Sequence, residues 1–374
     1  MPKNHNDASV TSTLTTIDSI ESITITVANV SHLTKAFSIQ SESAYISTMV
    51  FSVDGTLLAT GSAEGAISLW STQTGKRAAL LQGHTDVIND LAFSPNGKFL
   101  ASASRDKTVR MWNTTDGKEL AVFRDHLSNV THVSFSPDNK MLLSSGENAA
   151  ILWQLPTKTK VVLAEVQEDA PAFTGRFSPD GSIIVVSARN SDTEIWTTSS
   201  LKLQGKLLCH NGGVSADIFT PIVFRPDGRL VACGLASGAI QVWDIVPLKE
   251  LITFQQKDDT VMDLLFSPNG KVLATTGDNT VQLWSISSRT ALLDQQLDCS
   301  TVTNAVFSPD SSLLGYGGYC PKKETGFLTL FDTNSGRQVT IFNIKGLVSH
   351  VAFHPKGTQI VTTVGGEIHF WMLH

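Results

Sequence analysis

The chain has 374 residues, of which 41% are hydrophobic and 17% charged, and its formal net charge at pH 7 is -6. This composition is typical of a folded globular protein and excludes a long disordered chain. No apolar run approaches the roughly 18 residues that a membrane-spanning helix needs, and the negative net charge gives no general attraction to nucleic acids or anionic membranes. We therefore expect a globular protein that binds neither nucleic acid nor membrane.

The N-terminal segment and the cysteines bear on the cellular compartment. Residues 1–20 are rich in Ser and Thr and have no apolar stretch after Lys3, so we expect a disordered segment without a secretory signal. The four cysteines form no CxxC pair and no even framework, which predicts neither a metal site nor a disulfide-bonded fold. These features favour the reducing cytoplasm.

A repeat runs through the rest of the chain with a period close to 42 residues. Each unit starts with a Phe followed by a turn sequence such as FSPNG, and a second aromatic residue closes the unit. All seven tryptophans of the chain occupy this second position, and Phe331 occupies it in the remaining unit. The starting residues are Phe51, Phe93, Phe135, Phe177, Phe224, Phe266, Phe307 and Phe353. Such self-similarity predicts a repeat architecture.

Each unit has the pattern of four short β-strands, which we name a to d. In the unit that starts at Phe93, we expect strands over 88–93, 99–104, 109–112 and 119–123. These segments are short, contain β-branched or aromatic residues and are bounded by Pro, Asn, Asp and Gly, which favours strands joined by turns. Strands b and c carry apolar or small residues on both faces, which indicates a sheet packed between two others.

The turn FSPDG, the apolar strand that follows it and the strand that ends in Trp resemble the pattern of the WD-repeat family. The literal Trp-Asp pair occurs at Trp243 and Asp244 alone. The resemblance implies an all-β fold, a single WD-repeat β-propeller with one four-stranded blade per unit. Eight units predict eight blades, and seven, the commoner number in the family, stays as the alternative. The resemblance implies little about activity.

The last unit lacks a strand d of its own, because its strand c ends near Trp371. We expect an N-terminal strand over 34–39 to complete the last blade and thereby close the ring. The expected organisation is therefore a disordered segment over 1–20, a lead-in segment over 21–32 and the propeller over 33–374.

The second unit carries a polar set that allows two interpretations. Its members are His84, Ser102, Asp106 and Trp112. Ser, His and Asp could form a nucleophile with its base, but no nucleophile elbow or oxyanion-hole motif accompanies them. The resemblance implies instead a structural hydrogen-bond chain that holds the b–c turn on the blade. The set decays elsewhere: Glu147 stands where Asp is expected in the third unit, and Lys257 stands where His is expected in the sixth.

No catalytic residue, metal site or cofactor is predicted. The acidic residues of the a–b turns lie in separate units, one in each of five units, and each stands beside a Gly, Asn or Ser, so we interpret them as turn formers. The histidines outside the second unit have no metal-ligand spacing.

In a four-stranded meander the b–c turns and the d–a loops lie on one face of the ring, which we call the b–c/d–a face. Sorting the sequence in this way assigns fourteen acidic and seven basic residues to this face. Two insertions also fall there, 210–220 in a d–a loop and 317–326 in a b–c loop. Loops that exceed the length of the repeat often carry function, and in the WD-repeat family this face is the usual partner-binding surface.

These observations predict a non-catalytic scaffold or binding module, a cytoplasmic monomer that docks a protein or peptide of basic or mixed charge on the b–c/d–a face. The candidate partner-binding residues are Glu64, Arg105, Glu147, Arg189, Asp258, Tyr319, Lys322 and Lys323. The alternative is a propeller enzyme or small-ligand binder with its site in the central channel. Convergent ionisable side chains in that channel would favour this alternative.

Overall fold

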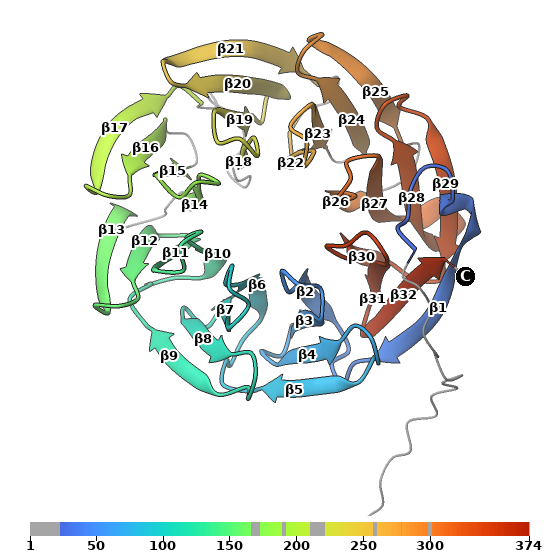
Figure 1. Ribbon diagram of the computed structural model, residues 1–374, viewed down its shortest axis with the longest axis horizontal. Coiled ribbons are helices and arrows are strands. Elements are labelled where there is room, and N and C mark those ends of the chain that lie inside the picture. The colour runs from blue at the N-terminus through green and yellow to red at the C-terminus, as the bar shows by residue number, and fades with distance from the viewer. Residues whose placement is uncertain are drawn as a thin grey trace, which may run out of the picture.

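The computed structural model describes residues 23–165, 173–188, 192–209, 221–256, 260–277, 279–297 and 301–373. Within these residues, thirty-two strands form eight four-stranded sheets in which strands consecutive in the chain are hydrogen-bonded neighbours, apart from the sheet that closes the ring. The sheets stand side by side around a central opening, each with its strand a innermost (Figure 1). The predicted eight-bladed propeller is confirmed, and the seven-bladed alternative is wrong.

The strands keep the same order in every blade, and their bounds follow by position. Strands a are β2 (Ile46–Phe51), β6 (Ile88–Phe93), β10 (Val130–Phe135), β14 (Phe173–Phe177), β18 (Ile222–Phe224), β22 (Asp263–Phe266), β26 (Thr301–Phe307) and β30 (Val348–Phe353). Strands b are β3 (Leu57–Ser62), β7 (Phe99–Ser104), β11 (Met141–Gly146), β15 (Ile183–Ala188), β19 (Leu230–Gly234), β23 (Val272–Thr276), β27 (Leu313–Cys320) and β31 (Ile360–Val364). Strands c are β4 (Ile67–Ser71), β8 (Val109–Asn113), β12 (Ala149–Gln154), β16 (Thr193–Thr197), β20 (Ala239–Ile245), β24 (Thr280–Ser285), β28 (Thr325–Asp332) and β32 (Glu367–Leu373). Strands d are β5 (Arg77–Leu81), β9 (Glu119–Phe123), β13 (Thr159–Glu165), β17 (Lys202–Leu207), β21 (Leu248–Gln255), β25 (Thr290–Gln296), β29 (Gln338–Ile344) and β1 (Leu33–Gln40).

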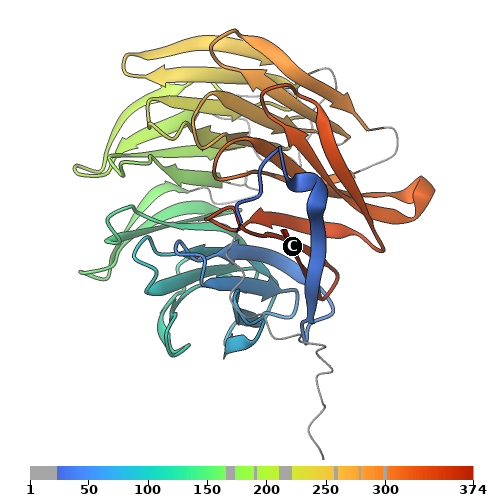
Figure 2. The ribbon, with the colours of Figure 1, turned by 45° about the vertical axis from the view of Figure 1, so that its right-hand side comes forward.

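The ring closes through β1, as predicted. This strand pairs antiparallel with β32, from Leu33 opposite Leu373 to Gln40 opposite Glu367, so the two ends of the described chain share blade eight. Figures 1 and 2 show β1 in blue along the outer side of the red C-terminal strands. Because both ends of the chain contribute hydrogen bonds to one sheet, the last blade is held against opening.

A short segment before β1 is fixed on blade eight. The backbone N–H of Ile25 donates to the carbonyl of Gly357 at 2.7 Å, and both Ile25 and Val30 are fully buried. Val30 opens the helical turn η1 (Val30–His32). In the described part of the chain, η1 and η2 (Pro321–Lys323) are the helices, and neither is long enough to span a membrane.

Apolar side chains fill the space between neighbouring sheets. In blade two, Leu91, Leu100 and Trp112 pack against Ile67 and Leu69 of blade one, and all five side chains are buried. Strands b and c are therefore covered on both faces, which explains why they lack the alternation of a half-exposed strand. The outer strands d are more exposed, as the burial pattern of β9 shows.

Candidate functional site

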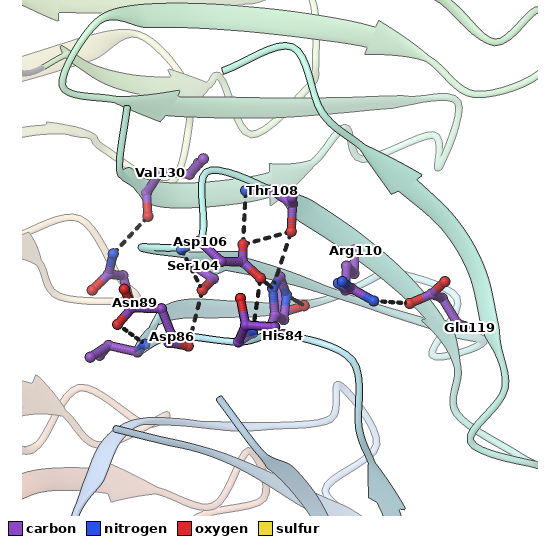
Figure 3. Close-up of polar contacts among 12 residues, drawn as sticks. His84, Asp86, Asn89, Ser104, Asp106, Thr108, Arg110, Glu119 and Val130 are labelled. Carbon is purple, nitrogen blue, oxygen red and sulfur yellow. Dashed lines mark hydrogen bonds and ion pairs between the residues drawn. The ribbon is translucent and has the colours of Figure 1, made fainter. Parts of the chain in front are cut away.

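The four polar residues of blade two form a continuous hydrogen-bond chain. Nδ1 of His84 lies 2.7 Å from Oδ2 of Asp106, and its Nε2 lies 2.7 Å from Oγ of Ser102. The indole N–H of Trp112 donates to the same hydroxyl oxygen at 2.9 Å. Figure 3 shows His84, in the loop that precedes β6, beside the b–c turn that carries Asp106. The chain thus joins the d–a loop, strand β7, the b–c turn and strand β8 of this blade.

The donors and acceptors of this chain indicate where the protons lie. Because the indole of Trp112 can only donate, the oxygen of Ser102 accepts from it, and the hydroxyl proton is directed at Nε2 of His84. His84 then carries its proton on Nδ1 and donates it to Asp106. Burial alone would raise the pKa of Asp106, but hydrogen bonds from His84 and Thr108 outweigh burial and hold that pKa well below its usual range.

Chemically, this arrangement contains the parts of a Ser-His-Asp triad but not its access to substrate. Ser102 is fully buried in strand β7, and its hydroxyl oxygen is occupied by Trp112. A nucleophile has to approach the reacting atom within hydrogen-bond reach of its base, which a fully buried hydroxyl cannot do. The arrangement is suited to holding the b–c turn and the preceding loop together.

Blade three keeps half of the chain. Nε2 of His126 lies 2.7 Å from Oγ of Ser144, which also accepts the indole N–H of Trp153. Burial lowers the pKa of His126 to about 4, so this ring is neutral at pH 7. Glu147 does not take the place of Asp106: it accepts hydrogen bonds from Ser128 and Asn129 of the neighbouring d–a loop.

In blade six a glutamine performs the role of the histidine. The hydroxyl of Thr275 donates to Oε1 of Gln256 at 3.1 Å, and Nε2 of Gln256 donates to Thr280 at 2.8 Å. Trp284 donates to Thr275, as Trp112 does to Ser102. The sequence count pointed one residue further, to Lys257, because it assumed a loop of fixed length. Lys257 lies outside the described residues, as does Asp278, which in this unit has the position that Asp106 has before Trp112.

In blade five a covalent bond replaces the His–Ser hydrogen bond. Cys233 lies on β19 at the position of Ser102, and it forms a disulfide with Cys209, just after β17. Both cysteines are fully buried, and the indole nitrogen of Trp243 has no hydrogen-bond partner among the described residues. Cys320 is disulfide-bonded as well. The expectation of a chain without disulfides is therefore wrong, because cysteine spacing in the sequence does not show which strands the ring brings together.

Three of the predicted partner-binding residues lie on consecutive b–c turns. Glu64 lies in the turn between β3 and β4, Arg105 in the turn between β7 and β8, and Glu147 in the turn between β11 and β12. The structure therefore places them on one face, on neighbouring blades (Figure 1). The side chains of Glu64 and Arg105 are exposed, whereas Glu147 is half-buried by its contacts with the d–a loop. Arg189 and Asp258 lie outside the described residues, as does the insertion 210–220.

The insertion 317–326 is a hairpin rather than an irregular loop. Its first residues extend β27 to Cys320, the turn η2 reverses the chain, and β28 starts at Thr325. Tyr319 is half-buried within β27, and Lys322 and Lys323 are exposed on η2. The insertion thus lengthens two paired strands and carries two lysines at its tip, on blade seven.

Ionisable side chains converge inside the ring, as the alternative interpretation would require. Burial raises the pKa of Asp90 on β6 to about 6, and the positive charge of Arg176 on β14 opposes this rise. Burial also raises the pKa of Asp263 on β22, and Arg176 opposes that rise too. Because these strands are the innermost strands of blades two, four and six, the charge of Arg176 acts on both carboxyls across the central opening. No group of three or more His, Cys, Asp or Glu within the described residues is placed to hold a metal ion.

The family of the chain follows from its repeats. The family model of the WD domain, G-beta repeat, matches residues 33–71, 75–113, 117–154, 201–244 and 248–285, which together exceed half of the chain. The chain belongs to the WD-repeat family. Each matched WD repeat begins at strand d of one blade and ends at strand c of the next, so the repeat in the sequence is offset from the blade in the structure.

Curated relatives match a part of this WD-repeat chain. The small ribosomal subunit protein RACK1 of Neurospora crassa is 34% identical over 96 residues, which are 25% of this chain and 28% of that protein. The MST50-interacting protein 11 of Pyricularia oryzae is 33% identical over 96 residues, with the same two shares. The chain therefore matches little more than a quarter of the length of either relative.

A solved structure matches nearly the whole WD-repeat ring. The computationally designed protein Ika8 superposes with a TM-score of 0.72 and 22% identity, over 90% of this chain and 99% of that protein. At this identity the likeness shows the fold and no more.

Replacing His84 with Ala in the second WD repeat is expected to lower the free energy of unfolding by about 1–3 kcal/mol, because Ser102 and Asp106 each lose a buried partner. Asp106→Ala should cost a similar amount. Since the pKa of Asp106 is lowered in the folded state, its contribution is present above the usual range of an Asp and is lost as the pH falls below it. Urea denaturation at pH 7 and at about pH 2, below the usual pKa of an Asp, measures both effects.

The matched control is Asp86→Ala, in the same loop. Asp86 is exposed, and its carboxylate accepts only from the backbone N–H of Val87 beside it among the hydrogen bonds of the described residues. Its replacement should change the urea midpoint little. A His84→Ala midpoint equal to that of the wild type would show that the buried chain does not hold the blade.

Proposed function

We propose that this WD-repeat propeller is a non-catalytic platform that binds a protein or peptide through its b–c/d–a face. The observation that carries the proposal is the pair Glu64 and Arg105. Both are exposed on successive b–c turns, and neither side chain makes a hydrogen bond or ion pair with the described residues. Long polar side chains held on rigid turns without partners of their own are available to another molecule. The name of the Pyricularia oryzae relative, an interacting protein, supports the same role.

The proposed partner is basic or of mixed charge, and the platform acts as a monomer without a cofactor. Acidic residues outnumber basic ones on the turns and loops of this face, so a basic partner would be attracted and oriented. Nucleic acid and anionic membranes fit this face poorly, because both would be repelled by the same charge.

We propose the cytoplasm as the compartment. The Neurospora crassa relative is named as a protein of the small ribosomal subunit, which supports this location. The disulfide between Cys209 and Cys233 argues the other way, because such bonds persist mainly in oxidising compartments. A cytoplasmic chain would hold this pair as two thiols.

The second candidate function is a small-ligand site in the central opening, and Arg176 is the observation that favours it. Within the described residues, its guanidinium makes no hydrogen bond or ion pair, although its charge opposes the rise in the pKa of both Asp90 and Asp263. A small molecule with a carboxylate and a cationic group would match this arrangement of one cation between two acids.

Charge reversal tests the proposed face. Wild type and a Glu64→Lys/Asp86→Lys variant are immobilised in parallel, and the proteins retained from lysate are quantified by mass spectrometry at low and high salt. We expect the variant to retain specific partners about tenfold less at low salt, with a smaller difference at high salt, because exposed charges are screened.

Two controls separate the candidates. Asp116→Lys reverses an exposed acid on the opposite face, in the c–d turn of blade two, and should leave retention unchanged. Arg176→Gln removes the charge in the central opening and should also leave retention unchanged. Equal retention by the wild type and the Glu64→Lys/Asp86→Lys variant would refute the acidic docking face, and loss of retention in Arg176→Gln alone would favour the central site.

A further inference from the structure

The a–b turn of blade five departs from the turn that six of the blades share. In six blades the residue after the starting Phe is a Ser whose hydroxyl donates to the Asp or Asn two residues later: Ser52, Ser94, Ser136, Ser178, Ser267 and Ser308. In blade five this residue is Arg225, which donates through Nε to Asp227 at 2.9 Å and also through Nη2. A compact hydroxyl is thus replaced by a long cationic side chain at the edge of the blade.

A second cation accompanies it. Arg229 closes the same turn and donates to Oδ2 of Asp244 through Nε at 3.0 Å and Nη2 at 2.8 Å. Asp244 is the Asp of the literal Trp-Asp pair, and its side chain is only 7% exposed, whereas that of Arg229 is 63% exposed. The Asp therefore positions an arginine whose other N–H groups remain in solvent.

A groove runs beside these residues between blades five and six. It consists of two hollows of about 260 and 480 Å³ that share Arg225. The larger is lined by the a–b turns of both blades, and the smaller continues towards the rim of the ring. Aliphatic side chains line the smaller hollow: Leu230, Leu251, Ile252 and Ile286.

The residues that line the groove include more cations than carboxylates. Its lining contains the cations Arg225, Arg229, Lys271 and Arg289 and the carboxylates Asp227 and Asp244, which leaves a net charge of +2. Both carboxylates are already paired, with Arg225 and Arg229. The side chains of Lys271 and Arg289 are exposed and make no hydrogen bond or ion pair with the described residues. Two cations on blade six therefore face the groove without a partner.

We propose that this groove binds an extended acidic segment of a partner protein, with apolar side chains on the aliphatic floor and carboxylates against Lys271 and Arg289. An extended peptide presents alternate side chains to opposite sides, which suits a floor and a rim of different chemistry. Single-stranded nucleic acid suits the groove less well, because none of the described residues that line it has an aromatic side chain on which a base could stack. The site lies on the face of the a–b and c–d turns, opposite the proposed docking face, and stands independently of it.

Fluorescence anisotropy with the full chain tests the proposal. The probe is a fluorescein-labelled decapeptide in which Glu alternates with Leu. Lys271→Glu/Arg289→Glu is expected to weaken its binding at least about tenfold. The matched control is Lys98→Glu/Lys118→Glu. Lys98 closes the same FSPNGK turn in blade two, and Lys118 follows the c–d turn of that blade. This control should bind the peptide like the wild type, and circular dichroism verifies that both variants are folded.

Three results would overturn the proposal. The first is unchanged binding by the Lys271→Glu/Arg289→Glu variant, and the second is equal weakening in the blade-two control, which would indicate general attraction to the whole face. The third is displacement of the peptide by a ten-nucleotide thymidine oligomer, added at the same total concentration of negative charge as the unlabelled peptide. This result would assign the groove to nucleic acid. Displacement by unlabelled peptide but not by a peptide in which Lys alternates with Leu would support it.

Discussion

Trp112→Ala is expected to lower the free energy of unfolding by about 3–5 kcal/mol, the usual cost of removing a large aromatic side chain from a core. Trp112 is 2% exposed and packs between blades one and two with Ile67, Leu69 and Leu81. Its removal leaves a cavity between two sheets and also deprives Ser102 of its indole donor. The two sheets can close the cavity only by moving relative to one another. Each of them also packs against a second neighbour in the closed ring, and this packing opposes the movement.

Trp112→Phe separates the two contributions. Phe keeps most of the packing and removes the N–H donor, and Phe331 shows that the fold accepts Phe at this position: it is 1% exposed and stacks on Tyr316. We expect Trp112→Phe to cost about 1–2 kcal/mol, clearly less than Trp112→Ala. Urea denaturation followed by circular dichroism measures both. If both variants lost the same stability, packing between the blades would not be the main contribution of Trp112.

The ring and its blades could be predicted from the sequence because the signals are local. A Pro, an Asn or Asp and a Gly within one turn fix the reversal between strands a and b, and a Trp at constant distance marks strand c. The pairing of β1 with β32 was predicted by counting, since one blade lacked a strand and one N-terminal segment had the right pattern. These features can be predicted without knowing which blades contact one another.

The features that the sequence did not show depend on contacts between distant segments. Gln256 was missed because the d–a loop that starts with it is one residue longer than the repeat predicts, so a fixed count back from Phe266 selects Lys257 instead. The convergence of Arg176 with Asp90 and Asp263 exists only once the ring has closed. Arg225 stood in the sequence as one variant of a repeated turn, and its significance appears only beside Lys271 and Arg289 of the next blade.

Cys209 and Cys233 are the clearest case, because the insertion 210–220 separates Cys209 from the turn that would have identified it. In the structure, the pair occupies the place of His84 and Ser102. A cross-link in the place of a hydrogen bond constrains the unfolded chain, and a loop closed by residues 24 apart is worth about 3–4 kcal/mol in the chain-entropy model. Cys209→Ala/Cys233→Ala should therefore unfold at a much lower urea concentration than the oxidised wild type.

Cys209→Ala/Cys233→Ser is the matched variant that identifies the cause. It lacks the cross-link too, but its hydroxyl takes the position at which Ser102 accepts the indole of Trp112. It can therefore accept from the indole of Trp243, which has no partner among the described residues. We expect this variant to recover about 1 kcal/mol of the loss and to stay well below the wild type. All three proteins are compared without reductant, because Cys320 is disulfide-bonded too. Equal urea midpoints for the wild type and the double Ala variant would show that the bond does not stabilise the ring. Recovery of full stability by the Ser variant would instead assign the stabilisation to the hydrogen bond, since that variant has no cross-link.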